Sequence, residues 1–304
     1  MEKADIGVPM ERDVVCGSVP VGHGSAQPTM RPLLVDVYLP PIGAPSGPAR
    51  AAVLLAHGGA FHRGSKSDDA FAQDGSPNTP VSEYCQILAR QGYVCFSLDY
   101  RLTQECPPPQ PAPILQNRSV SSERVNFVRN LMGLPPATSA QLIDGVEAAI
   151  CDIAAAFTFV AQHAVRWNID PARMALGGFS SGAIAASYAC YALGAPAAAM
   201  ISLSGGMAFE DAAHYLCQSS HRAPALLFSS ELDLPEAIAR TEELERAGQA
   251  VGMPLQRYLV PGKPHFYARS SPAVRVDAGA RGSAQADTVE KAITVFLANT
   301  LHRY

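Results

Sequence analysis

The chain has 304 residues, of which 48% are hydrophobic and 16% charged, and its formal net charge is −4. A mean hydropathy of +0.05 and the absence of an apolar run of roughly 18 residues are typical of a soluble globular protein without a membrane span. The negative net charge gives no basis for binding nucleic acid or an anionic membrane. We therefore expect a protein that acts on a small molecule.

The predicted elements alternate between strands and helices. In chain order we predict a strand at 33–39, a strand at 51–56, a helix at 81–88, a strand at 93–98, a helix at 141–164, a strand at 173–177, a helix at 183–193, strands at 199–203 and 225–228, a helix at 236–251, a strand at 255–260 and a helix at 287–301. Apolar strands separated by helices predict an α/β fold, in which helices cover both faces of a mostly parallel sheet. With no internal repeat and no clear break, we expect a single domain over residues 1–304.

Two long stretches do not fit this alternation. Residues 103–140 are proline-rich at first and apolar later, and residues 268–286 are polar and rich in glycine and serine. Loops of this length in a compact domain are usually functional or mobile. We interpret 103–140 as a cap or lid insertion over the site, with a surface excursion that has no role in the chemistry as the alternative.

The most informative motif is GFSSG at residues 178–182, between a predicted strand and a predicted helix. A chain of this length contains the pattern by chance in roughly one case in ten, so the motif alone is weak. In a strand–turn–helix setting, however, glycines at 178 and 182 allow a tight turn that pushes a serine hydroxyl out of the fold. The setting therefore predicts Ser180 as a nucleophile.

A serine hydroxyl needs a base to take its proton. In the strand–turn–helix hydrolase arrangement the acid and then the histidine follow the serine in the chain. Of the histidines after Ser180, His265 comes directly after the last predicted strand, where open α/β sheets keep their sites. His214 and His221 fall in a polar linker and His302 near the end of the chain, so we predict His265 as the base.

The acid is expected just after the preceding strand. The run 225–228 leads into Glu231 and Asp233, and we choose Asp233, with Glu231 as the rival. A carboxylate here would hold the tautomer of the imidazole and stabilise the imidazolium that forms during turnover.

A donor loop for the developing oxyanion is predicted at HGGAF, residues 57–61, directly after a strand. Two of the backbone N–H groups of Gly58, Gly59 and Ala60 are expected to donate, with the N–H of Ser181 as the third donor. His57 is expected to be structural, because it lies far before the serine in the chain.

Together these motifs resemble a known family. HGGAF followed by GSK at 64–66, DYRL at 99–102, and DPAR at 170–173 leading into GFSSG are similar to the α/β-hydrolase carboxylesterases, and most closely to the bacterial esterase and hormone-sensitive-lipase-like group. The resemblance covers roughly residues 33–300. It implies Ser180 as nucleophile, Asp233 as acid and His265 as base, and it implies a structural role for Asp99 and Arg101 beside the donor loop.

The chain also departs from that pattern. Ala60 replaces the third glycine, as the feruloyl-esterase-like and formamidase-like branches allow, and Ala183 stands where a further glycine is common. The stretch after Arg101 does not continue as the usual proline–glutamate sequence, so the pocket-forming insertion at 103–140 belongs to this chain. Substrate choice therefore cannot be carried over from the family.

We expect a serine hydrolase that cleaves a carboxylic ester of a small or medium-sized substrate through an acyl-enzyme. Apolar residues in the insertion (Ile114, Leu115, Phe127, Leu131 and Met132) suggest an acyl or aryl group of modest size. The alternatives are an amide or formamide hydrolase, such as an arylformamidase or a peptidase, and a ligand-binding protein that has lost catalysis on a hydrolase scaffold.

Location and cofactors follow from what the chain lacks. The first residues contain no apolar stretch typical of a signal peptide, so we expect a cytoplasmic protein. Seven scattered cysteines without a Cys-x-x-Cys or Cys/His ligand spacing indicate reduced thiols, and we expect no metal and no organic cofactor. A homodimer is compatible with the sequence, which does not decide the oligomeric state.

Overall fold

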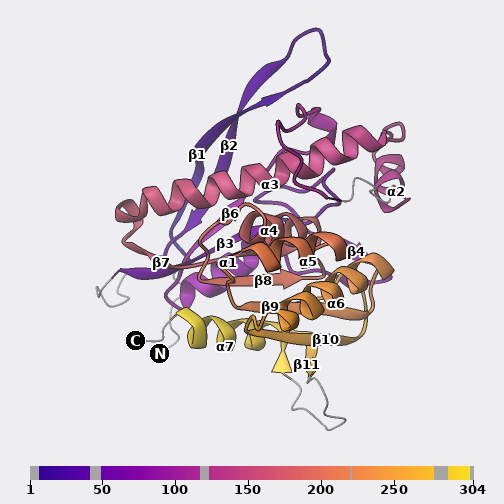
Figure 1. Cartoon of the computed structure of the whole chain (residues 1–304). Coiled ribbons are helices and arrows are strands. Elements are labelled where there is room, and N and C mark those ends of the chain that lie inside the picture. Colours follow the sequence, from indigo (N-terminus) through magenta and orange to yellow (C-terminus); the bar gives the residue numbers. More distant parts are fainter. Residues whose placement is uncertain (1–6, 42–48, 117–122, 220, 277–286, 302–304) are drawn as a thin grey trace.

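A ten-stranded sheet with strand order β1-β2-β6-β3-β7-β8-β9-β10-β11-β12 forms the centre of the computed structural model (Figure 1). The structure describes residues 7–41, 49–116, 123–219, 221–276 and 287–301. The strands are β1 (Met10–Val21), β2 (Thr29–Tyr38), β3 (Arg50–Ala56), β6 (Val94–Leu98), β7 (Ile169–Phe179), β8 (Ala199–Leu203), β9 (Ala225–Leu232), β10 (Leu255–Pro264), β11 (Pro272–Val276) and β12 (Asp287–Thr288). A separate short hairpin pairs β4 (Ala72–Gln73) with β5 (Ser76–Pro77).

The six central strands, from β6 to β10, are parallel, and the outer strands on each side pair antiparallel. β6 and β8 are buried at every position, and β3 at every position except its first. Strands that are buried on both faces are expected to be continuously apolar, as these are. The prediction of a mostly parallel sheet is therefore confirmed.

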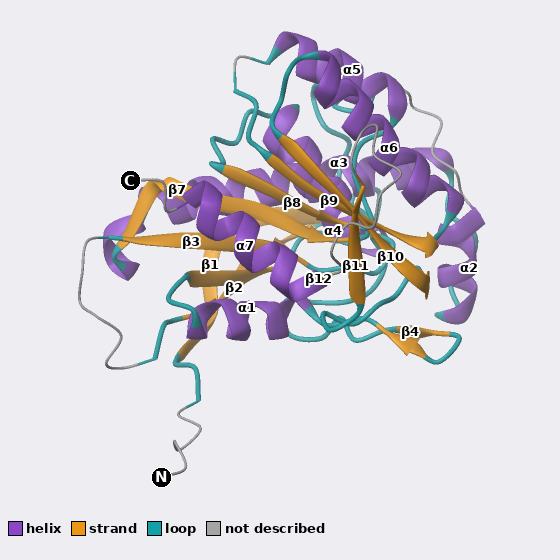
Figure 2. Ribbon diagram, turned by 90° about the horizontal axis from the view of Figure 1, so that it is seen from below, coloured by secondary structure: helices purple, strands orange, loops and turns teal. Residues whose placement is uncertain are grey.

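The helices cover both faces of the sheet (Figure 2). They are α1 (Val81–Arg90), α2 (Glu123–Leu131), α3 (Ser139–Gln162), α4 (Ser181–Tyr191), α5 (Phe209–Gln218), α6 (Pro235–Ala250) and α7 (Val289–Leu301), with short 3-10 turns η1 (Thr103–Glu105) and η2 (Ala164–Trp167). The buried side chains form two cores: α3, α4, α5 and α6 contribute to one, and α1 and α7 contribute to the other. The sheet thus lies between two helical layers.

Three elements differ from the sequence predictions. β1 was not predicted; it pairs with β2 in a hairpin that extends beyond the body of the molecule (Figure 1). The polar linker predicted around His214 is helix α5. The stretch 268–286 was predicted to be a loop but contains strand β11, which extends the sheet through β10, while its part from 277 to 286 lies outside the described residues.

Candidate active site

Ser180 occupies a sharp turn between β7 and α4. Its backbone has φ 52° and ψ −117°, a strained conformation for a residue with a side chain. The Ser180 N–H donates to the carbonyl oxygen of Leu203, 2.8 Å away, on the neighbouring strand β8. A Cβ atom on Gly182 would lie 2.2 Å from the carbonyl oxygen of Ala56, so only glycine fits where the turn passes β3. The turn therefore holds the Ser180 side chain outside the sheet and helix layers.

His265 and Asp233 meet Ser180 at the carboxyl ends of the strands. Nε2 of His265, the residue directly after β10, lies 2.8 Å from Oγ of Ser180, and its Nδ1 lies 2.5 Å from Oδ1 of Asp233. A carboxylate can only accept, so Nδ1 carries the proton and Nε2 is left to accept from the serine hydroxyl. The three side chains thus form a connected hydrogen-bond chain from carboxylate to imidazole to hydroxyl.

The Asp233 carboxylate is buried and fully supplied with donors. Oδ2 accepts from the Ser204 hydroxyl at 2.5 Å and from the Ser230 N–H at 3.1 Å, and Oδ1 also accepts from the Leu234 N–H at 2.8 Å. Burial alone raises the pKa of Asp233, but the hydrogen bond and charge of His265, together with the other donors, outweigh it and hold that pKa below its usual value. Asp233 therefore faces His265 as a carboxylate.

Glu231, the rival acid, lies away from His265. It is exposed near the end of β9, and its carboxylate accepts from the backbone N–H of Gly262 at 2.7 Å. Of the two acids considered, the structure brings only Asp233 to the imidazole.

The HGGAF loop lies against the Ser180 turn. A Cβ atom on Gly58 would lie 3.6 Å from Cβ of Ser180, and Gly59 has φ +125°, which favours glycine. A hydrogen bond from the Gly58 N–H helps to hold the buried Asp69 carboxylate, so this N–H is turned to Asp69. Ala60 has φ 56° and lines the cavity beside Ser180. The N–H groups of Gly59 and Ala60 are therefore the better candidates for oxyanion donors.

Ser181 supplies a further N–H at the start of α4. As the first residue of the helix it has no acceptor for its N–H within the helix, and the helix dipole places partial positive charge there. Ser181 also lines the cavity beside Ser180.

Buried side chains behind the donor loop hold it in place. The His57 ring stacks on Tyr100 with 4.2 Å between ring centroids, and its Nδ1 donates to the Gly58 carbonyl at 2.7 Å. Burial lowers the pKa of His57 to about 4, so the ring is neutral at pH 7. The Asp99 carboxylate accepts from the Lys66 N–H at 2.7 Å, where the chain leaves the loop. The contacts of His57 and Asp99 are thus with the donor loop and the residues beside it, which fits the structural role expected for both.

The sequence and the fold of the chain are similar to those of known esterases. Residues 139–242, which include Ser180 and Asp233, match the family model described as phospholipase/carboxylesterase. Esterase 2 of Thermogutta terrifontis phosphorylated by paraoxon has a TM-score of 0.57 at 15% identity, with 96% of this chain and 94% of that chain covered. The chain has the α/β-hydrolase fold.

Two further structures of the same Thermogutta esterase agree with this hydrolase fold. The form phosphonylated by cyclosarin has a TM-score of 0.54 at 16% identity, covering 85% of this chain and 84% of that chain. The propionate-bound form has a TM-score of 0.54 at 15% identity, covering 85% of both chains. A sequence comparison with curated proteins finds no match. The expected resemblance to carboxylesterases is thus confirmed, while the hormone-sensitive-lipase-like subgroup stays a prediction.

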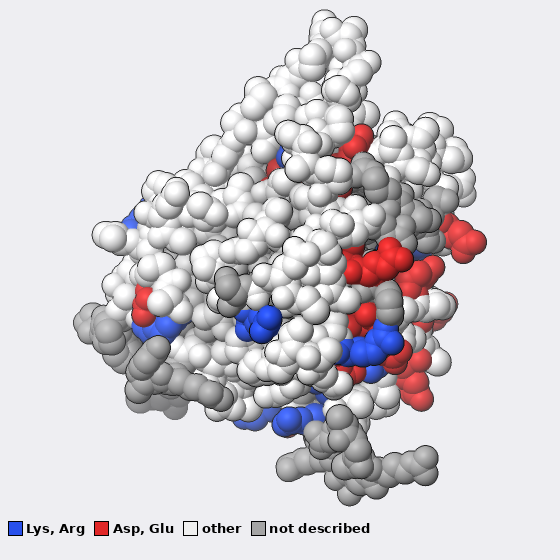
Figure 3. All heavy atoms as spheres, in the orientation of Figure 1, with Lys and Arg blue, Asp and Glu red and all other residues white. Residues whose placement is uncertain are grey.

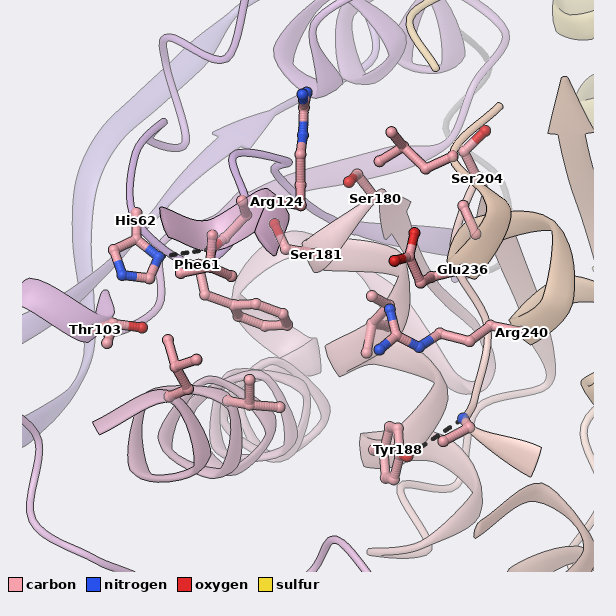
Figure 4. Close-up of a pocket in the computed structure, with 18 of the residues that line it drawn as sticks. Phe61, His62, Thr103, Arg124, Ser180, Ser181, Tyr188, Ser204, Glu236 and Arg240 are labelled. Carbon is pink, nitrogen blue, oxygen red and sulfur yellow. Dashed lines mark hydrogen bonds between the residues drawn. The ribbon is translucent and has the colours of Figure 1, made fainter. Parts of the chain in front are cut away.

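A cavity of about 150 Å³ opens beside Ser180 in this hydrolase fold (Figure 4). Apolar side chains from four parts of the chain line it: Phe61, Leu115, Leu142, Val146 and Ile184. A volume of about 150 Å³ is enough for a group the size of benzene. The cavity therefore suits a short acyl chain or a small ring next to the reactive serine.

The insertion at 103–140 takes part in this cavity, but of the five apolar residues named from the sequence only Leu115 is among those that line it. Leu115, Arg124 and Val125 line the cavity, whereas Phe127, Leu131 and Met132 on and after α2 are 54%, 60% and 38% exposed. The inference of a substrate from those three side chains was wrong, because they lie on the outer side of α2. Residues 117–122 of the insertion lie outside the described part.

Polar residues that the sequence did not single out also belong to the site. Ser204 holds Asp233, and Asp69 holds the donor loop. Arg124, Glu236 and Arg240 line the cavity. The one sequence signal for Ser204 is its place directly after β8, because polar residues at the carboxyl ends of parallel strands often belong to the site.

The charges seen in Figure 3 are sparse over most of that face and gather at one side, where acidic and basic groups are interleaved. Among the described residues, no three His, Cys, Asp or Glu side chains are grouped so that they could hold a metal ion. In the same residues, no helix is long and apolar enough to cross a membrane.

All seven cysteines are described, and each is a free thiol.

Proposed function

We propose that this chain is a serine hydrolase that cleaves carboxylic esters of small or medium-sized substrates through an acyl-enzyme. The observation that supports this most is the hydrogen-bond chain from Asp233 through His265 to Ser180, with 2.5 Å and 2.8 Å between the paired atoms. The match of residues 139–242 to the phospholipase/carboxylesterase family supports the ester as the bond that is cleaved.

In the acylation step, Oγ of Ser180 attacks the ester carbonyl carbon while Nε2 of His265 takes the hydroxyl proton. The carbonyl π electrons move to the oxygen, which becomes the oxyanion of a tetrahedral intermediate. When this intermediate collapses, the bond to the alcohol oxygen breaks, and His265 returns its proton to that leaving oxygen. The products are a free alcohol and an ester of the acyl group with Ser180.

Deacylation repeats these steps with water. His265 takes a proton from water as the water oxygen attacks the acyl-enzyme, and it then gives the proton to Oγ of Ser180. The carboxylic acid leaves and the serine is restored. Throughout, the Asp233 carboxylate holds the Nδ1–H of the imidazole and stabilises the imidazolium.

The oxyanion is assigned to the N–H groups of Gly59, Ala60 and Ser181. These groups belong to the donor loop and to the start of α4, and Ala60 and Ser181 line the cavity together with Ser180. Loss of one donor in such a site typically costs about 100- to 1000-fold in turnover. No metal or organic cofactor enters any step.

The test is hydrolysis of 4-nitrophenyl butyrate by the wild type and by Ser180→Ala, with Ser181→Ala as the matched control that keeps its backbone N–H. We expect an initial burst of nitrophenol in the wild type and the control and none in Ser180→Ala. Hydrolysis of the matching anilide or of N-formylkynurenine at a higher kcat/KM than the ester would show that the preferred substrate is an amide.

A cytoplasmic location and a homodimer are part of the proposal, and size-exclusion chromatography tests the homodimer.

A further inference from the structure

An arginine that has no hydrogen-bond or ion-pair partner among the described residues reaches into the cavity beside Ser180. Arg240, on α6, is partly buried, and Figure 4 shows its side chain extending into the cavity with the guanidinium end turned toward the middle. Within the described part of the chain its guanidinium makes no hydrogen bond and no ion pair. A partly desolvated cation without a partner is costly, so this group is suited to receive an anion from a ligand.

The neighbouring acids do not neutralise Arg240. Asp211 lines the same cavity, but its Oδ1 accepts from the Gln116 N–H at 2.9 Å and its Oδ2 accepts from the Tyr188 hydroxyl. Glu236, one helical turn before Arg240, is exposed and forms no ion pair with it. Asp211 is thus held by other partners, while the Glu236 carboxylate is turned into the cavity (Figure 4) without an ion pair to Arg240 among the described residues.

A second guanidinium adds positive charge to the cavity. Arg124 of α2 also lines it; its guanidinium carbon lies 5.5 Å from the centre of the Phe127 ring, and the charges of Arg63 and Asp233 act on it. With Asp211 and Glu236 included, the cavity holds charges of both signs. Apolar side chains form much of the remaining wall beside Ser180, and Arg240 reaches into this space without a hydrogen bond or ion pair to any described residue.

We propose that this cavity is a subsite for esters that carry a second, anionic group, and that Arg240 binds a carboxylate placed a few bonds away from the ester that Ser180 attacks. The inference rests on the proposed function and adds a substrate class to it. The apolar wall would hold the linking methylene groups or ring, and the guanidinium would hold the carboxylate, with two parallel N–H donors available for its two oxygens.

The experiment compares matched neutral and anionic esters. One pair places the charge on the acyl side (monomethyl glutarate against methyl hexanoate, followed by proton release), and the other places it on the alcohol side (4-acetoxybenzoate against 4-tolyl acetate). The quantity measured is the ratio of kcat/KM for the anionic ester to that for the neutral one. It is measured in the wild type, in Arg240→Gln and in Arg240→Lys.

The matched control is Arg246→Gln, on the same helix but paired with Glu243 at 2.7 Å and 63% exposed. We expect Arg240→Gln to lower the ratio by about 10- to 100-fold for one of the two pairs, through a higher KM for the anionic ester, and Arg246→Gln to leave it unchanged. Arg240→Lys should restore part of the ratio, because it keeps the charge but not the planar pair of donors.

The neutral esters separate this inference from the proposed function. Neutral ester hydrolysis that stays within about threefold of the wild type shows that Arg240→Gln is folded and active. An unchanged ratio for both pairs in that variant would overturn the anionic subsite and leave the serine hydrolase intact. Absence of hydrolysis of every ester by the wild type would overturn the proposed function itself.

Discussion

The Ser204 hydroxyl lies 2.5 Å from Oδ2 of Asp233, on the carboxylate oxygen that His265 does not contact. Ser204 follows β8 with φ 52°, and its N–H donates to the carbonyl oxygen of Phe228 at 3.0 Å. The hydroxyl therefore has a fixed position from which it orients the carboxylate. The hydrogen bond also lowers the pKa of Asp233, against the effect of burial.

Ser204→Ala is expected to lower kcat by about tenfold with little change in KM, because a hydrogen bond to a charged group is lost and the carboxylate is less well oriented. The measurement is steady-state hydrolysis of 4-nitrophenyl butyrate. The control is Ser202→Ala, two residues earlier, whose buried hydroxyl has no hydrogen-bond partner among the described residues. Equal kcat values in the two variants would contradict a positioning role for Ser204.

Gly59→Ala is expected to abolish most of the activity. A Cβ atom there would lie 1.9 Å from the carbonyl oxygen of Arg63, and φ is +125°, so the donor loop must move. We expect kcat to fall by at least about 100-fold, the effect of losing an oxyanion donor. Gly24→Ala is the control, since Gly24 also has positive φ (+76°) but has nothing within 4 Å of the added atom. Similar kcat values in the two variants would argue against the HGGAF loop as donor.

Asp69 predicts a pH dependence of stability. Burial raises its pKa to about 7, although the N–H groups of Val81 and Gly58 donate to it. Between about pH 4 and 7 the folded chain keeps a proton that the unfolded chain has lost. The free energy of unfolding should therefore fall by up to about 1.4 kcal/mol per pH unit across this window as pH rises, and level off above it.

Asp69→Asn removes that ionisation and should flatten the slope between pH 4 and 7, measured by urea unfolding at several pH values. The control is Asp68→Asn, because Asp68 is the exposed neighbour of Asp69; this variant should keep the wild-type slope. A wild-type slope in Asp69→Asn would show that another group causes the pH dependence.

Arg101 and Asp152 form a buried ion pair behind the donor loop. Nη2 and Oδ1 are 2.7 Å apart, and the two side chains are only 5% and 2% exposed. Arg101→Met leaves the carboxylate buried without its charge partner and is expected to lower the free energy of unfolding by about 3–5 kcal/mol. The matched change Arg166→Met breaks the exposed pair with Glu11 and is expected to cost about 1 kcal/mol or less. Equal losses of unfolding free energy in the two variants, measured by urea unfolding, would contradict the larger contribution assigned to the buried pair.

Much of the fold could be predicted from the sequence because the central strands are continuously apolar. Residues 51–56 and 199–203 were predicted as strands and are strands. β1 was missed because Val14 and Cys16 face the core while Val15 between them is 57% exposed, so the apolar residues do not alternate with polar ones. Helix α5 was missed because polar residues around His214 resemble those of a linker.

The positions of Ser180 and His265 in the chain were predictable because the strand ends that carry them have recognisable motifs. For the acid, the sequence favoured Asp233 but kept Glu231 as a rival, because both follow the apolar run of β9 and lie only two residues apart. Ser204 and Arg240 were not predictable, because their roles depend on contacts between segments that only the folded sheet brings together. In the sequence, Arg240 is one of several charges on an amphipathic helix.

The most direct test of the central claim is covalent labelling by a fluorophosphonate, followed by intact-protein and peptide mass spectrometry. An activated serine attacks the phosphorus and releases fluoride, so one adduct per chain is expected, located on Ser180. Labelling should be lost in Ser180→Ala and slowed by orders of magnitude in His265→Ala, while Ser181→Ala should label like the wild type. An unlabelled wild type, or an adduct that persists in Ser180→Ala, would contradict the assignment of Ser180 as the nucleophile.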